Sequence, residues 1–365
     1  MHPVLGILIG LVPAVAYGCM MPFSTKIGGT TQQKTLAITF ACFVVGVITM
    51  IVEFATIGLD YSSPQAILFF FIALISGFFW YMGSFYEFKA VTAAGVSKAM
   101  PFSMVGQFVT VTLISAFFFG DWLIVPQEQL FLGLTFILVM LVGIVLISMN
   151  PNVSYEAPKK DFIANVAKPK SSSFKFYLYI GLSVVGFLLY FLIPELINKL
   201  GQKNIGDQPN WLYGGEFFVN PNTEFDKGMM FPQSLGMFIA AGATISITTL
   251  MKMRKNNVSL VQEEKVVLNI FKDKRTYLNL IPGLLQAVGN LLLLVSILLN
   301  GNTIAEPLTN LSVVIATLLG IFYMKEKKVQ PYMTTTILGL VLIVIGSLAC
   351  GFMDLDLSID PTPEG

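Results

Sequence analysis

The sequence has few of the side chains on which most enzymes depend. It contains one histidine, His2, and three cysteines, and only 12% of its 365 residues are charged. A single histidine excludes histidine-based metal sites and catalytic triads, so we expect no metal, no cofactor and no enzymatic activity. The net charge of +1 gives no reason to expect a nucleic-acid partner. Cys19, Cys42 and Cys350 are far apart in apolar sequence, which predicts buried thiols rather than disulfides.

Apolar residues, in contrast, are abundant. They make up 55% of the chain, Phe alone accounts for 31 residues, and the mean hydropathy is +0.75, unlike a soluble domain. Ten runs approach the about 20 apolar residues that a helix needs to cross a bilayer. We therefore predict an all-α integral membrane protein with ten transmembrane helices. The predicted spans are 4–22, 37–58, 66–86, 100–119, 131–149, 177–197, 231–251, 277–299, 305–324 and 332–352.

Two segments of the chain are diverged copies of one unit. An offset of 206 residues places Gly77 on Gly283 and Gly83 on Gly289, and further matches follow without a gap. The first copy covers predicted spans three and four, and the second covers spans eight and nine. Because the copies are five spans apart, an odd number, they cross the membrane in opposite directions. The sequence thus predicts two inverted five-helix repeats, the usual construction of secondary transporters.

The second helix of each copy has a distinctive start. Residues 95–101 and 301–307 each combine a glycine, a Ser or Thr and a proline. A glycine gives the turn conformational freedom, a Ser or Thr side chain can cap the helix, and proline is tolerated in the first turns. We therefore expect Ser97 and Thr303 to cap these two helices.

Basic residues are distributed unevenly between the alternate loops. All but three of the 22 Lys and Arg lie on one side, and the three exceptions share one loop. Because cytoplasmic loops carry the excess of Lys and Arg, we predict a multi-pass plasma-membrane protein with both termini outside the cytoplasm. The predicted organisation is a first five-helix half at 1–149, a cytoplasmic linker at 150–176, a second half at 177–352 with an outer loop at 198–230 and a basic inner loop at 252–276, and an acidic tail at 353–365.

Polar side chains within the predicted spans are few, and lipid cannot satisfy their hydrogen bonds. Gln and Asn amides both donate and accept, as sugar hydroxyls require, and an aromatic ring can pack against the C–H face of a sugar. Each amide alone is equally well explained by a hydrogen bond between helices. Together, at matching places in two inverted copies, they predict a substrate cavity. The candidate residues are Trp80, Tyr81, Ser84, Ser103, Gln107, Gln286, Asn290, Thr309 and Asn310.

Uphill uptake also requires a group that couples transport to an ion gradient. Glu53 is the deepest acidic residue of the first six predicted spans, about a turn and a half from the outer end of its helix. We predict that Glu53 couples transport to protons, with a purely structural carboxylate as the alternative.

Several motifs lie in spans three, four, eight and nine. They are Phe79-Trp-Tyr-Met-Gly83, Gly95-Val-Ser-Lys-Ala-Met-Pro-Phe-Ser103 with Gln107, Phe119-Gly-Asp-Trp122, Gly289-Asn290 and Thr317-Leu-Leu-Gly-Ile-Phe-Tyr-Met-Lys-Glu-Lys-Lys328. Their order and spacing resemble the bacterial glucose/ribose uptake permeases of the drug/metabolite transporter superfamily. The resemblance implies ten helices in two inverted halves and sugar uptake driven by protons.

These features together predict a secondary active transporter that imports a neutral monosaccharide of the glucose or ribose class. It would work by proton symport with alternating access, as a monomer or homodimer whose partners are the sugar and the lipid bilayer. The alternative is an exporter or exchanger of another small metabolite, such as an amino acid or an amine, on the same architecture.

Overall fold

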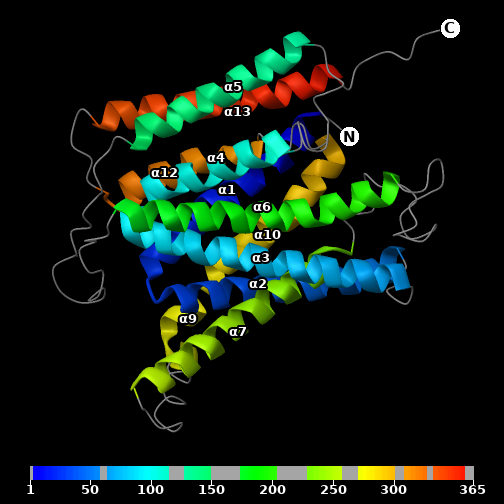
Figure 1. Cartoon of the computed structure of the whole chain (residues 1–365), viewed down its shortest axis with the longest axis vertical. Coiled ribbons are helices and arrows are strands. Elements are labelled where there is room, and N and C mark those ends of the chain that lie inside the picture. Colours follow the sequence, from blue (N-terminus) through cyan, green and yellow to red (C-terminus); the bar gives the residue numbers. More distant parts are fainter. Residues whose placement is uncertain are drawn as a thin grey trace. The chain divides into compact units, whose positions relative to one another are not determined.

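The computed structural model describes residues 3–57, 64–114, 127–148, 173–203, 228–256, 270–300, 308–326 and 332–357, and these are helical apart from short turns, with no strand among them (Figure 1). The elements in chain order are α1 (Pro3–Ile27), α2 (Thr31–Ile57), α3 (Pro64–Ala94), α4 (Val96–Leu113), α5 (Gln127–Ser148), α6 (Ser173–Lys203), α7 (Met230–Asn256), α9 (Lys274–Leu278), α10 (Leu280–Asn300), α12 (Ser312–Leu318), the π-helical turn η2 (Leu319–Tyr323) and α13 (Tyr332–Leu357).

Seven of the described helical segments are long and apolar enough to cross a membrane. Two further apolar helices, at 308–323 and 333–349, are shorter. The lipid-facing character is visible on α5, where Leu138 and Val145 are 61% and 58% exposed. The prediction of an α-helical membrane protein is therefore confirmed, while the count of ten spans stays a prediction.

The predicted spans 66–86 and 100–119 leave a loop at 87–99, and this prediction was wrong. Only Gly95 separates α3 from α4, and Lys89 and Lys98 lie within the two helices. The Nζ atoms of Lys89 and Lys98 lie 5.6 and 5.5 Å from the ring centroids of Tyr179 and Phe176. Each ammonium lies over an aromatic ring of α6, so both lysines are accommodated within helices that continue past their apolar runs.

The chain divides into two compact units, and each combines segments from both predicted halves. The first unit comprises residues 1–22, 89–184 and 288–365, and the second comprises residues 23–88 and 185–287.

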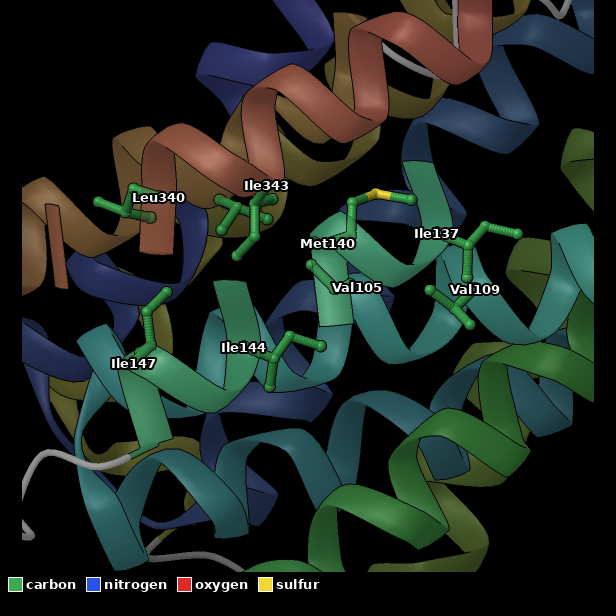
Figure 2. Packing of buried hydrophobic residues seen from close by; sticks show 9 residues of the cluster. Val105, Val109, Ile137, Met140, Ile144, Ile147, Leu340 and Ile343 are labelled. Carbon is green, nitrogen blue, oxygen red and sulfur yellow. The ribbon is translucent and has the colours of Figure 1, made fainter. Parts of the chain in front are cut away.

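The core of the first unit lies where α4, α5 and α13 meet. Figure 2 shows Leu340 and Ile343 of α13 facing the buried side chains of α5, with Val105 and Val109 of α4 beside them. A Cβ atom on Gly143 of α5 would lie 2.6 Å from the carbonyl oxygen of Gly339 on α13, and the reverse distance is also 2.6 Å. The two glycines therefore let the backbones of α5 and α13 run in contact, side by side in Figure 1.

The second unit is built on the packing of α2 against α7. Its buried cluster contains Leu36, Tyr81, Ala240, Ala241 and Ile245. Gly77 of α3 lies against the backbone of Gln233 on α7, so closely that a side chain there would overlap it.

Within this second unit, side-chain hydrogen bonds join the end of α1 and the turn that follows it to Asn279, which lies between α9 and α10. Asn279 is fully buried; its Oδ1 accepts from the Ser24 hydroxyl at 2.6 Å, and its Nδ2 donates to the Gly28 carbonyl at 3.1 Å. Thr30 and Gln33 form a capping box at the start of α2, and the Gln33 amide also donates to Asp273 at 3.1 Å.

Candidate functional site

Helix α4 places Ser103 and Gln107 one turn apart on the same face. The Gln107 Nε2 donates to the Ser103 hydroxyl at 2.9 Å, and that hydroxyl lies 3.3 Å from the hydroxyl of Ser183 on α6. The approach of the two helices depends on Gly106, because a Cβ atom there would lie 2.8 Å from the Val184 side chain. Ser103 is buried and Gln107 half-buried. The bond to Ser103 uses one amide hydrogen, and the amide has a second hydrogen and a carbonyl oxygen with which to bind a hydroxyl.

Asn290 of α10 is held by a tyrosine that the sequence analysis did not identify. The hydroxyl of Tyr17 on α1 donates to the Asn290 Oδ1 at 2.8 Å. The tyrosine ring lies on Gly289, where a Cβ atom would be 2.5 Å from the ring Cε1. The hydrogen bond from Tyr17 holds the amide oxygen of the half-buried Asn290 and thereby sets the orientation of its NH₂ group. The one signal in the sequence was a polar tyrosine within the first apolar run.

Two other predicted residues of the first unit, Thr309 and Asn310, lie in the helical turn just before α12. Both are half-buried. The first unit thus holds Ser103, Gln107, Asn290, Thr309 and Asn310.

The predicted residues of the second unit are Trp80, Tyr81 and Ser84 on α3 and Gln286 on α10. They are buried, with 2% to 6% of their surfaces exposed. The Trp80 ring packs edge-on against Phe187 of α6, with ring centroids 6.0 Å apart. Tyr81 stacks on Phe85 at 5.8 Å within the apolar cluster. Both aromatic rings thus lie against other aromatic rings, and their role in substrate binding stays a prediction.

Glu53 is half-buried on α2, near the end of the helix. Its neighbours Val52 and Phe54 are 52% and 49% exposed, as expected of a helix that faces lipid. In the parts of the chain that the structure describes, no group of three or more His, Cys, Asp or Glu side chains could hold a metal ion.

The sequence analysis also missed Glu326, which lies three residues after the end of η2. Its Oε1 accepts from the backbone N–H of Val96 at 2.7 Å, and its Oε2 accepts from the N–H of Ser97 at 3.0 Å. Glu326 is only 2% exposed, so the carboxylate is buried against the first turn of α4. Ser97 was predicted to cap this helix, and that was wrong, because its hydroxyl makes no hydrogen bond and the first-turn amides bond Glu326 instead. The other predicted cap, Thr303, lies outside the described residues.

The sequence of this chain is similar to those of a family of bacterial proteins. The family model described as "Sugar transport protein" matches residues 8–208 and 219–353. A putative sugar uptake protein of Listeria monocytogenes is 30% identical over 349 residues, which cover 95% of this chain and 99% of that protein. The glucose uptake protein of Staphylococcus xylosus is 28% identical over 342 residues, covering 94% and 96%. That of Bacillus subtilis is 25% identical over 348 residues, covering 94% and 97%.

Proposed function

Because the chain belongs to the sugar transport protein family, we propose that it imports a neutral monosaccharide of the glucose or ribose class across the plasma membrane. The observation that carries this proposal is the family match at residues 8–208 and 219–353, nearly the whole chain. Relatives aligned over almost their full length are named sugar or glucose uptake proteins, which agrees with it.

The polar groups of the first unit suit a neutral solute. Gln107 and Asn290 each present an amide that can donate to one hydroxyl and accept from another. Ser183 and Tyr17 hold the two sites in place through bonds of 3.3 Å to Ser103 and 2.8 Å to Asn290. None of these groups carries a charge, so an uncharged sugar binds them without needing a counter-ion.

We propose that transport proceeds by alternating access between two inverted repeats. Glycines that lie 206 residues apart, at matching positions of the two copies, pack against matching helices. In the first copy, Gly77 packs on α7 and Gly83 packs on Phe187 of α6. In the second copy, Gly283 packs on α2 and Gly289 packs on Tyr17 of α1. The partner helices α6 and α7 are the sixth and seventh predicted spans, five after α1 and α2, so the contacts follow the repeat.

Helix pairs within each unit support the same arrangement. The packed pairs include α2 with α7, α4 with α12 and α5 with α13. Each pair joins predicted spans that occupy the same position in the two halves. Such a repeat gives inward-open and outward-open forms of similar energy.

We further propose that uptake is proton symport, with Glu53 as the coupling residue and both termini outside the cytoplasm. Glu53 is the deepest acidic residue of the first six predicted spans, and the structure places it half-buried on α2. The orientation is supported by the excess of Lys and Arg in one set of loops.

Uptake into proteoliposomes tests this function. Labelled glucose, ribose and other neutral sugars are offered with and without an inward proton gradient. We expect gradient-driven accumulation that is lost in Glu53→Gln, while counterflow of the same sugar survives. The matched control is Glu128→Gln, because Glu128 is exposed in the first turn of α5 and should not affect coupling. If folded protein neither takes up nor exchanges any sugar, the proposal is wrong, and export of another metabolite becomes the leading alternative.

A further inference from the structure

Helix α4 begins without a cap of its own. Its N-cap position is Gly95, with φ of 89°, and a glycine has no side chain with which to bond the first-turn amides. Buried N–H groups at a helix start normally need a hydrogen-bond partner, because an unsatisfied buried N–H group destabilises the fold. Because Gly95 alone connects α3 to α4, the hydrogen-bond partner of these N–H groups has to come from another part of the chain.

Glu326 supplies that partner from 230 positions further along the sequence. Both carboxylate oxygens are used, one on Val96 and one on Ser97, at 2.7 and 3.0 Å. The negative charge also faces the positive end of the helix dipole. We call these two bonds the Glu326 clasp.

The surrounding backbone is shaped to admit the carboxylate. A Cβ atom on Gly95 would lie 3.0 Å from Oε1 of Glu326, and one on Gly320 would lie 2.9 Å from the Ser97 nitrogen. The π-helical turn η2 and the left-handed Lys325, with φ of 55°, turn the chain so that Glu326 reaches α4. The Glu326 amide then donates to the Gly320 carbonyl at 3.2 Å. π-Helical turns are frequent where a helix serves a function.

We propose that Glu326 is a positioning residue for sugar binding. The clasp ties the start of α4 to the end of η2, and α4 also packs on α12 within the same unit. From Ser97 to Ser103 is six residues, or about 9 Å along the helix. The clasp therefore sets the position and tilt of the segment that carries Ser103 and Gln107, without Glu326 touching the sugar. This inference rests on the proposed function for its transport readout.

The first test measures the concentration dependence of glucose counterflow in proteoliposomes. Glu326→Ala removes two charge-assisted hydrogen bonds, and we expect the KM for glucose to rise by about tenfold or more. Glu326→Gln keeps one acceptor oxygen and should raise the KM by a smaller factor, so that the conservative variant partly rescues binding. Glu128→Gln, on the exposed start of α5, is the control and should stay within about twofold of the unchanged protein. A KM within about twofold for both Glu326 variants in folded protein overturns the proposal.

The second test does not depend on the substrate. Ser97 is fully buried, so a Ser97→Cys protein should resist a membrane-permeant maleimide while the clasp is closed. Adding Glu326→Ala, which removes both bonds, should release the first turn of α4 and increase the labelling rate severalfold over the same protein with Glu326. Protein with its native cysteines alone measures the background. If labelling is unchanged, the clasp does not hold α4, and the inference fails even if sugar uptake is established. If labelling rises but no sugar is transported, the clasp is real and the proposed function is wrong.

Discussion

Replacing Tyr17 by Phe removes a single hydroxyl that holds Asn290. Its bond to the Asn290 Oδ1 is 2.8 Å long and partly buried. A hydrogen bond of this kind contributes about 0.5–1.5 kcal/mol net. If the bond fixes the Asn290 amide toward the sugar, its loss should raise the KM for glucose by about two- to tenfold, because about 1.4 kcal/mol corresponds to a factor of ten. The ring remains on Gly289, so the packing of α1 on α10 is unchanged and the maximal rate should be little affected.

The assay is glucose counterflow in proteoliposomes, measured as a double-mutant cycle with Asn290→Ala. If Tyr17 acts through Asn290, adding Tyr17→Phe to Asn290→Ala should cause no further rise in KM. The matched control is Tyr190→Phe, because the Tyr190 hydroxyl donates to the Gln233 amide oxygen at 3.2 Å in the other unit. Its KM should stay within about twofold. Independent, additive effects of Tyr17→Phe and Asn290→Ala would refute the reasoning, as would an unchanged KM in Tyr17→Phe.

Two further predictions concern stability, measured as the Tm of the protein in detergent. Gly143→Ala puts a Cβ atom 2.6 Å from the Gly339 carbonyl oxygen. It should lower the Tm by several degrees, since overpacking costs about 1–3 kcal/mol. In the control Gly181→Ala, the new Cβ atom meets nothing within 4 Å, so the Tm should stay equal or rise. Equal losses in the two variants would contradict the close packing of α5 and α13. The backbone N–H of Arg275 bonds the Asp273 carboxylate and holds its pKa below the ordinary value, with the Gln33 side chain and the Arg275 charge adding to this. A lowered pKa stabilises the fold above the ordinary value of about 3.9, so the Tm difference between the protein and Asp273→Ala should be full at neutral pH and shrink as the pH falls below about 4. A difference that grows toward acid would show that the sign is wrong.

Some predictions failed because they inferred the environment of a residue only from the residues next to it in the sequence. A capping Ser97 was expected from the local pattern of glycine, serine and proline, yet the cap is Glu326. Lys89 and Lys98 fell between two predicted spans because the apolar runs end there, but both lie in helices, with their ammonium groups over aromatic rings of α6. In both cases the partner lies on another helix, where no local pattern can indicate it.

The sequence by itself determined the helical membrane class and the approximate positions of the seven described helices that are long and apolar enough to span a bilayer, because about 20 consecutive apolar residues have few other stable environments. It also predicted the repeat, since an offset of 206 residues aligns the glycines. Only the tertiary structure decided which polar groups meet. Tyr17 and Asn290 are 273 residues apart, and Glu326 and Val96 are 230 apart. Such bonds depend on how close two helices come and how each is rotated, and those quantities are set by packing across the whole unit rather than by the period of any one segment.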